Sequence, residues 1–148
     1  QVLASMLEYS NNFIANALFL LLAQHGERGG LDMAQARRAA QRWARKNFGW
    51  SGYRIEDGAG LSRGNRLSAR QLLDVVVAFK PYMELLPEYK DRVRAKTGTL
   101  KGVSSYAGFV KRPGGWQPFS LLINQSVPYG LRKQVAEALA RTPDLARY

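Results

Sequence analysis

The sequence predicts an α+β domain in which helices come first and an antiparallel sheet follows. Apolar side chains recur at helical spacing in the first 91 residues, whereas three segments of the last third alternate as strands do. Pro113, Gly114 and Gly115, between the second and third of these segments, are typical of a hairpin turn. We therefore expect one domain over residues 1–148, with a helical part at about 1–91 and a part made of strands and a last helix at about 92–148.

The helical part is expected to contain helices at 2–24, 32–47 and 68–80. The polar triplet Ser10-Asn11-Asn12 interrupts the first and predicts a junction of two helices, with Ser10 or Asn11 capping the second. Ser68 is expected to cap the last of the three. In 32–47 the side chains expected to face the core are Ala34, Ala39, Ala40, Trp43 and Ala44.

The strands are expected at 92–100, 104–111 and 117–126, as a three-stranded antiparallel meander. Pro128 then opens a terminal amphipathic helix that runs to about residue 141, since proline is favoured in a first helical turn.

The chain carries a formal net charge of +11 and no cysteine, which excludes disulfides and thiolate chemistry. Its basic residues are spread along the sequence, so we expect a solvated surface and no nucleic-acid partner. A nucleic-acid-binding domain would instead show tight, salt-sensitive binding. The longest apolar run, residues 13–23, is too short to cross a bilayer, so no transmembrane segment is expected.

Neither a metal nor a cofactor is expected. His25 is the only histidine and lies at a predicted helix end, and the acidic residues show no spacing typical of metal ligands. The loop 57–62 (DGAGLS) is rich in glycine but lacks the lysine of a P-loop and the third glycine of a dinucleotide-binding fingerprint. We assign this loop no chemical role.

The segment Lys96-Thr97-Gly98-Thr99 places a cation, two hydroxyls and a glycine in a predicted strand. Lys96 would supply a positive field for a carboxylate, Thr97 a neutral donor, and Gly98 the room for an extended ligand. The backbone of Thr99 would offer an N–H to a developing oxyanion and a C=O to a substrate amide. Taken alone, the segment fits a solvated strand end as well as it fits a carboxylate cradle.

The motifs S-x-N, at Ser10 and Asn12, and K-T-G, at 96–98, stand in the order found in penicillin-recognising serine enzymes. Together with the runs YSNNFIAN, EDGAGLSRGNRLSARQL and AKTGTLKGVSSYAGFV, they resemble the D-alanyl-D-alanine carboxypeptidase/endopeptidase family typified by penicillin-binding protein 4. The resemblance covers nearly the whole chain in order. It implies the C-terminal part of a β-lactamase/transpeptidase-like domain.

The resemblance also implies a role for each motif residue. Ser10 would relay a proton toward the leaving amine, and Asn12 would hydrogen-bond the substrate's amide carbonyl and help hold the lysine partner of the nucleophile. Lys96 and Thr97 would bind the terminal carboxylate of a D-Ala-D-Ala stem peptide. The N–H of Thr99, beyond the glycine, would form one half of the oxyanion hole.

The nucleophile of this family is a serine with a lysine three residues later, and no serine of this chain fits that pattern. We therefore expect the nucleophile and the first strands to lie upstream in a longer parent protein, and the 148 residues alone to be inert. The strand at 117–126 would then expose an apolar edge. Either the missing N-terminal half or a second copy of the chain would cover it.

The resemblance implies that the parent is a periplasmic serine-type D-Ala-D-Ala carboxypeptidase/endopeptidase that acts on peptidoglycan stem peptides through an acyl-enzyme and is inhibited by β-lactam antibiotics. Two alternatives stay open: a non-catalytic homologue that binds peptidoglycan or a partner protein, and a serine β-lactamase-like protein. The residues that precede Gln1 would discriminate, because an S-x-x-K motif at a helix start favours the enzyme.

Overall fold

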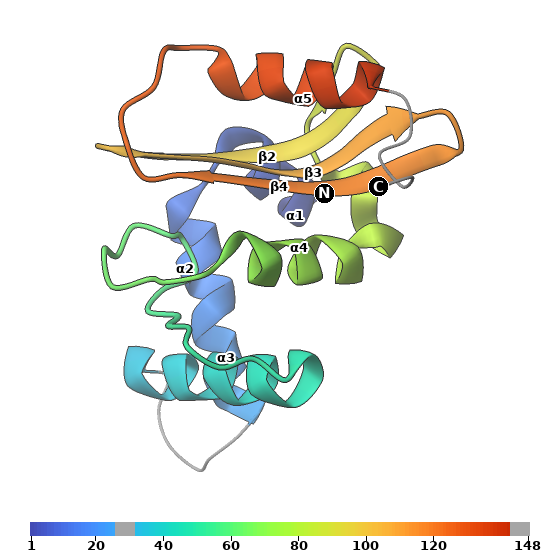
Figure 1. Cartoon of the computed structure of the whole chain (residues 1–148). Coiled ribbons are helices and arrows are strands. Elements are labelled where there is room, and N and C mark those ends of the chain that lie inside the picture. The colour runs from blue at the N-terminus through green and yellow to red at the C-terminus, as the bar shows by residue number, and fades with distance from the viewer. Residues whose placement is uncertain (26–31, 143–148) are drawn as a thin grey trace. The chain divides into compact units, whose positions relative to one another are not determined.

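A computed structural model of the chain describes residues 1–25 and 32–142. They fall into two units, Gln1–Ser68 and Ala69–Tyr148 (Figure 1). The first unit is helical and the second holds the sheet, so the α+β fold class is confirmed. The expectation that residues 1–148 form one partial domain stays a prediction.

In the first unit, the polar triplet joins two helices as expected. The first helix ends at Ser10, whose φ of 54° lies in the left-handed region. The side chain of Asn11 accepts a hydrogen bond from the Ile14 N–H at 3.0 Å, so Asn11 rather than Ser10 caps the second helix. The helices of this unit are α1 (Val2–Tyr9), α2 (Asn12–Leu21), the 3-10 helix η1 (Leu22–His25) and α3 (Met33–Phe48).

The core of the first unit forms where α3 packs against α2. Asp32 caps α3 by accepting a hydrogen bond from the Gln35 N–H at 2.8 Å. Ala36 and Ala40 are one helical turn apart and are buried together with Phe19 of α2. Small side chains on one face of α3 therefore let the two helices approach closely.

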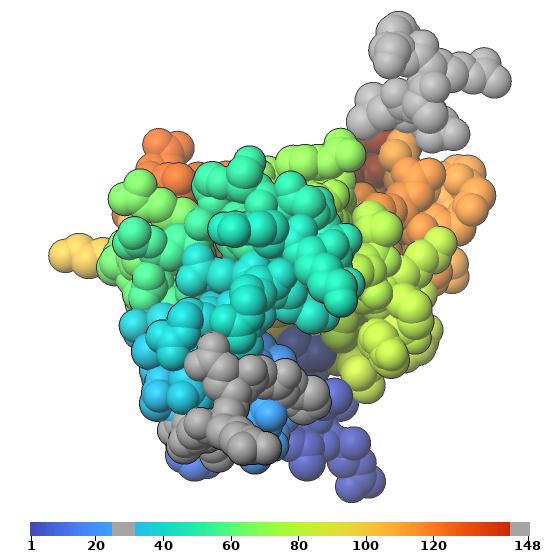
Figure 2. Space-filling view, turned by 90° about the horizontal axis from the view of Figure 1, so that it is seen from below, coloured from blue at the N-terminus to red at the C-terminus, as the bar shows by residue number. Residues whose placement is uncertain are grey.

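The expected core face of α3 is partly wrong. Ala40 and Ala44 are buried as predicted, but Ala34 is exposed and the Trp43 side chain is 57% exposed. The Trp43 ring instead meets the edge of Phe48, with the ring centroids 5.3 Å apart. Figure 2 shows α3 and the loop that follows it side by side at the surface of this unit. The aromatic residue therefore belongs to the helix end and not to the core.

The second unit is a three-layered α/β/α arrangement in which α4 and α5 lie on opposite faces of one sheet (Figure 1). The predicted meander is confirmed, because β2, β3 and β4 pair antiparallel in sequence order. A short strand, β1, adds a fourth member beside β2 that the sequence did not predict. The elements are α4 (Ala69–Ala78), η2 (Lys80–Leu85), β1 (Glu88–Tyr89), β2 (Val93–Leu100), β3 (Val103–Arg112), β4 (Gly115–Ile123) and α5 (Leu131–Arg141).

The sheet face under α5 carries the core of this unit. Val93, Tyr106, Val110 and Phe119 are buried there with Ala136 of α5. The rings of Tyr106 and Phe119 pack edge to face, 5.4 Å apart. Each large apolar side chain that is fully buried contributes about 1.5–3 kcal/mol to folding. Burial also raises the pKa of the Tyr106 phenol, which stays neutral at physiological pH.

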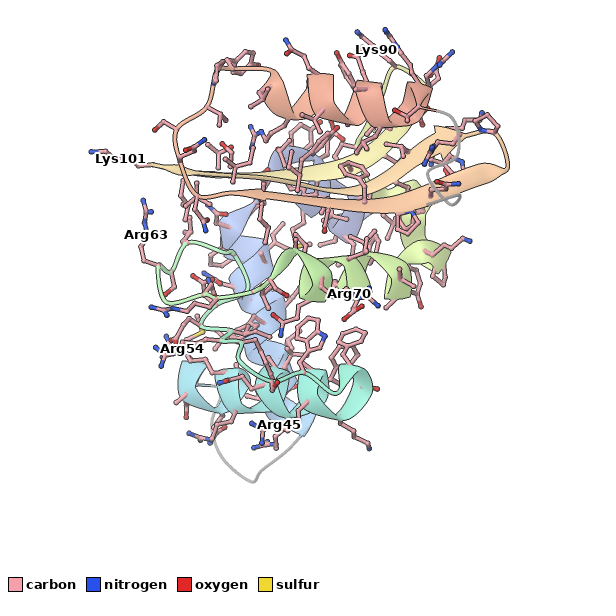
Figure 3. The ribbon with its side chains drawn as sticks, in the orientation of Figure 1. Arg45, Arg54, Arg63, Arg70, Lys90 and Lys101 are labelled. Atoms are coloured by element: carbon pink, nitrogen blue, oxygen red, sulfur yellow. The ribbon has the colours of Figure 1, made fainter. Side chains whose placement is uncertain are left out.

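The basic side chains labelled in Figure 3 come from both units, and Lys90 and Lys101 mark opposite ends of the sheet in the second. None of the helices formed by residues 1–25 and 32–142 combines the length and the apolar character needed to cross a membrane.

β4 is the last strand on its side of the sheet among the described residues. The Lys111 N–H of β3 bonds to the Arg92 C=O on the β2 side of the sheet. Because alternate residues of a strand bond to opposite neighbours, Val110, Gly108 and every second residue before them bond to β4. In this register Phe119 bonds to β3, whereas the N–H groups of Ser120 and Leu122 point outward. Pro118 occupies an outward position and has no N–H to offer. Proline at such a position is typical of an edge strand, as the sequence predicted for this segment.

Arg94 connects the sheet to its surroundings in this unit. Its guanidinium pairs with Glu84 of η2 and with Glu88 of β1, the latter at 2.7 Å, and its Cζ lies 5.5 Å from the centre of the Trp116 ring on β4. The Arg94 side chain is only 18% exposed, whereas the Glu84 and Glu88 side chains are 72% and 38% exposed, so the guanidinium is shielded from solvent and its two partners are not.

Replacing Arg94 by methionine is expected to lower the free energy of unfolding by about 1–3 kcal/mol, because two carboxylates lose a shielded partner. Urea denaturation measures the loss. The matched control is Arg70→Met, since the Arg70 side chain is 84% exposed and pairs with Asp74 at 3.5 Å along one helix. That variant should change stability by less than about 0.5 kcal/mol. Equal losses would show that Arg94 contributes no more than a surface ion pair.

Candidate active site

Residues 96–99 lie in the second half of β2, where successive side chains alternate between the two sheet faces. Because Val93 and Ala95 are buried on the α5 face, Thr97 and Thr99 belong to that face too. Lys96, between them, belongs to the α4 face. The motif therefore distributes its side chains over both faces of one strand.

The outer edge of β2 has no strand beside it from Lys96 onward among the residues that the structure describes. β1 pairs only with the first two residues of β2, and the Ala95 N–H donates to the Pro87 C=O at 3.0 Å. Alternate residues of a strand direct their N–H and C=O to the same edge, so those of Thr97 and Thr99 also point outward. An extended ligand could pair with this edge as an additional strand.

The Lys96 ammonium lies at the same edge, because its Nζ donates a hydrogen bond to the Thr97 C=O at 2.9 Å. A positive charge beside outward-directed N–H groups favours a carboxylate or a developing oxyanion. The chemistry expected of residues 96–99 is thus compatible with their geometry.

Gly98 has a packing reason to lack a side chain. A Cβ at this position would lie 2.4 Å from the Ser105 Oγ on the neighbouring strand β3. The Ser105 hydroxyl would have to rotate away to admit a Cβ, so packing across the two strands disfavours a side chain here without excluding one. The expected role of Gly98 toward a ligand stays a prediction.

Arg132 contacts this segment, although sequence reasoning did not place it in the site. From the first turn of α5, its Nη1 donates to the Gly98 C=O at 2.6 Å, to the Thr99 Oγ1 at 2.9 Å and to the Ser105 C=O at 3.2 Å. The sequence holds 22 lysine and arginine residues, and no local pattern distinguishes this one. Only the pairing of β2 with β3 under α5 reveals it.

Ser10 and Asn12 lie at the junction of α1 and α2 in the first unit, and both are exposed. Ser10 adopts the left-handed conformation, which costs a residue with a Cβ about 1–2 kcal/mol. Its N–H closes α1 by donating to the Met6 C=O. A non-glycine residue held in this region is a recognised signal of a functional position.

Asn16 anchors the loop 57–62 to α2, the helix that begins with Asn12. Its side-chain carbonyl accepts hydrogen bonds from the N–H groups of Gly58 and Ala59, both at 3.0 Å. Asn16 lies one helical turn after Asn12. The sequence alone assigns Asn16 no role.

The Asp57 carboxylate holds the loop in shape. It accepts hydrogen bonds from the N–H groups of Gly60, Leu61 and Ser62 at 2.7, 3.1 and 2.8 Å, and from the side-chain amide of Asn65 at 2.9 Å. Hydrogen bonds to a charged acceptor contribute more than neutral ones, about 1.5–3 kcal/mol each. The loop that sequence reasoning left unassigned is thus a rigid support for α2.

The predicted site residues form two groups, one in each unit. Ser10 and Asn12 belong to Gln1–Ser68, and residues 96–99 belong to Ala69–Tyr148. The structure brings the members of each group together within their own unit. No group of three or more histidine or acidic side chains in the described residues is placed to hold a metal ion.

Comparison with known proteins identifies relatives over nearly the whole length. The model of the D-Ala-D-Ala carboxypeptidase 3 (S13) family matches residues 1–87 and 86–142. A carboxypeptidase DacB of Mycolicibacterium smegmatis is 34% identical over 118 residues, which cover 61% of this chain and 25% of that protein. A D-alanyl-D-alanine carboxypeptidase of Actinomadura sp. is 27% identical over 94% of this chain and 31% of that protein. The chain thus spans only about a quarter to a third of the length of these relatives.

The fold is also shared with a solved structure. Penicillin binding protein 4 of Haemophilus influenzae, in its crystal structure with a novel β-lactam, superposes with a TM-score of 0.77 at 24% sequence identity. The similarity covers 93% of this chain and 39% of that one. The expected likeness to a transpeptidase-like domain is therefore confirmed at the level of the fold.

Replacing Gly58 by alanine is expected to lower the free energy of unfolding by about 1–3 kcal/mol through overpacking. The new Cβ would lie 2.5 Å from the Ala15 C=O and 2.6 Å from the Phe19 Cβ, so the loop would have to move off α2. Urea denaturation measures the loss, and the side-chain amide resonances of Asn16 report the displacement.

Gly60→Ala is the control for this prediction. Gly60 has a φ of +74° with no atom within 4 Å of the new Cβ, so its cost is that of the left-handed conformation, about 1–2 kcal/mol. The Asn16 resonances should stay unchanged in this variant. Unchanged Asn16 resonances in Gly58→Ala would contradict the anchoring role of the loop.

Proposed function

The chain belongs to the D-Ala-D-Ala carboxypeptidase 3 (S13) family, and on this premise we propose that the whole protein is a serine-type carboxypeptidase/endopeptidase that cleaves the D-Ala-D-Ala ends of peptidoglycan stem peptides. The observation that carries the proposal is the open edge of β2 at residues 96–99, where an ammonium, a backbone N–H and a backbone C=O lie in one row. Because its substrate is the cell wall, we place the whole protein in the bacterial periplasm.

The substrate binds along the open edge of β2. Lys96 and Thr97 hold the terminal carboxylate of the stem peptide through charge-assisted hydrogen bonds. The Thr99 C=O accepts a hydrogen bond from a substrate amide, so the peptide lies as an added strand. The Thr99 N–H then faces the oxygen of the scissile carbonyl, where negative charge develops in the transition state.

The reaction proceeds through an acyl-enzyme on a serine that lies outside these 148 residues. Its Oγ loses its proton and bonds to the carbonyl carbon of the penultimate D-Ala, the peptide C–N bond breaks, and that proton reaches the leaving amine through Ser10. Asn12 binds the amide carbonyl of the substrate and helps hold the lysine partner of the nucleophile. Water then hydrolyses the ester, which releases the shortened peptide and restores the serine hydroxyl.

β-Lactams acylate the same serine in this proposal. Support comes from penicillin binding protein 4 of Haemophilus influenzae, which was crystallised in complex with a β-lactam and shares the fold of this chain. The carboxylate of the antibiotic would take the place of the terminal carboxylate of the stem peptide beside Lys96.

A second candidate function is that of a non-catalytic homologue that binds peptidoglycan or a partner protein. The 148 residues leave it open, because the serine nucleophile of the first candidate is assigned to residues outside them. The two functions differ in whether the whole protein forms a covalent acyl-enzyme.

We expect a fluorescent penicillin to label the whole protein and not the 148-residue chain. Lys96→Ala in the whole protein should lower the second-order rate constant of labelling about 10- to 100-fold, because a charged hydrogen-bond donor contributes about 1.5–3 kcal/mol. Lys101→Ala, at the tip of the β2–β3 hairpin (Figure 3), removes the same charge and should leave the rate within about twofold.

Other outcomes of the labelling experiment are equally informative. Covalent labelling of the 148-residue chain alone would contradict the assignment of the nucleophile to residues outside it. An unlabelled whole protein would favour the non-catalytic homologue. Rapid turnover of penicillin, with hydrolysed product released within seconds, would favour a serine β-lactamase-like protein.

We also propose that the outward edge of β4 is covered in the whole protein, either by a strand from outside these residues or by a second copy of the chain. The outward N–H groups of Ser120 and Leu122 have no strand partner among the described residues. Backbone N–H groups that lack a strand partner and lie next to apolar side chains favour pairing with a further strand.

Hydrogen exchange tests the covering of β4. In the dilute 148-residue chain, the amide protons of Ser120 and Leu122 should exchange at least about tenfold faster than those of Phe119 and Leu121, which bond to β3. Protection of Ser120 and Leu122 should appear in the whole protein, or in the concentrated chain where a second copy is the partner. Fast exchange of both amides under all three conditions would contradict the proposal.

A further inference from the structure

In the proposed function the Thr99 N–H is the oxyanion donor. Arg132 forms a hydrogen bond with the peptide group to which this N–H belongs. The Gly98 C=O and the Thr99 N–H belong to one trans peptide plane, so they point in opposite directions. The C=O points inward and accepts the hydrogen bond from the Arg132 Nη1 at 2.6 Å. The N–H points to the open edge of β2.

We infer that Arg132 is a positioning residue for the oxyanion hole: its guanidinium fixes and polarises the Gly98–Thr99 peptide, and the Thr99 N–H thereby becomes a stronger and better aligned donor. The inference rests on the proposed function, because it needs an oxyanion at the edge of β2. Hydrogen bonds polarise one another along a chain, and a cation on the C=O side of an amide increases the partial positive charge of its N–H.

The other contacts of Arg132 restrict the same peptide. Its Nη1 also donates to the Thr99 Oγ1 at 2.9 Å and to the Ser105 C=O at 3.2 Å. The Ser105 C=O and the Gly98 C=O come from residues that pair across β2 and β3. The guanidinium therefore holds Thr99 by its side chain and by the peptide before it, which limits rotation of the peptide plane during the reaction.

Attachment of α5 to the sheet does not need Arg132. Ala136 and Ala140 of α5 are buried in the core cluster with Val93 and Tyr106. Lys90 of the β1–β2 turn bonds to Glu137 of α5 at 2.8 Å. These contacts lie along the rest of the helix, whereas Arg132 is half-buried in the first turn of α5 and bonds the Gly98 and Ser105 C=O groups, near the turn that joins β2 to β3.

The test uses the whole protein and the variants Arg132→Met, Arg132→Lys and Lys133→Met. Lys133 is the neighbouring cation on α5 and lies over the Tyr89 ring, so its replacement removes the same charge without touching β2. The binding constant of a penicillin is measured separately from the rate constant of acylation. The infrared stretching frequency of the ester C=O in the acyl-enzyme reports the hydrogen bonds to that oxygen.

Arg132→Met should lower the acylation rate constant about 10- to 100-fold, somewhat less than the loss of an oxyanion donor itself. The binding constant should stay within about threefold, and the ester C=O stretch should move to higher frequency. Arg132→Lys should restore part of both, because it keeps a cation near the Gly98 C=O but replaces the planar guanidinium whose Nη1 makes all three contacts. Lys133→Met should change neither.

Three results would overturn the inference. A weaker binding constant with an unchanged acylation rate would mean that Arg132 contacts the ligand carboxylate directly. An unchanged rate and an unchanged ester frequency in Arg132→Met, or in Arg132→Lys if the methionine variant does not fold, would leave Arg132 only a packing role. Failure of the unmodified protein to acylate at all would overturn the proposed function and remove the premise.

Discussion

The antiparallel register of β2 with β3 is the constraint on which the second unit and its candidate site depend. It runs without interruption from Val93 opposite Val110 to Leu100 opposite Val103. The same alternation that buries Val93 under α5 turns the amide of Thr99 to the open edge and puts Lys96 on the other face. If the register slipped by one residue, the burial of Val93, the direction of the Thr99 amide and the face that carries Lys96 would all be reversed. The core and the site are therefore specified by one pattern, and the apolar residues protect the position of the polar ones.

The first unit positions its two motif residues differently. Ser10 and Asn12 lie at a helix junction and not in a strand that is hydrogen-bonded to its neighbours. A junction has few backbone hydrogen bonds of its own, and Ser10 adds an unfavourable conformation. The chain compensates with a polar support: Asn16 fastens the loop 57–62 to α2, and Asp57 accepts several N–H groups within that loop. A loop rich in glycine is thereby made rigid by one carboxylate.

Much of this arrangement could be predicted from the sequence, because the signals are local. The helix junction follows from three polar residues in an apolar segment, and the meander follows from alternation and a proline-glycine turn. The misses are non-local. Trp43 was expected in the core because helical periodicity marks a hydrophobic stripe without its exact centre, and the buried stripe centres on Ala36, Ala40 and Ala44 instead. β1 is only two residues long and forms because β2 offers an edge.

Arg132 escaped sequence reasoning for a physical reason. The motif residues supply side chains whose chemistry can be recognised by type and spacing, whereas the oxyanion donor proposed at Thr99 is a backbone N–H, a group that every residue except proline carries. The chain can adjust such a donor only through groups bonded near it. One is the hydrogen-bond partner of the C=O in the same peptide group, and the other is the side chain of the residue that carries the N–H. Arg132 contacts both, at Gly98 and Thr99. In a site that relies on backbone donors, the supporting residue is therefore any side chain that the fold brings to the C=O of the same peptide group. Only the register of the strands shows which side chain that is.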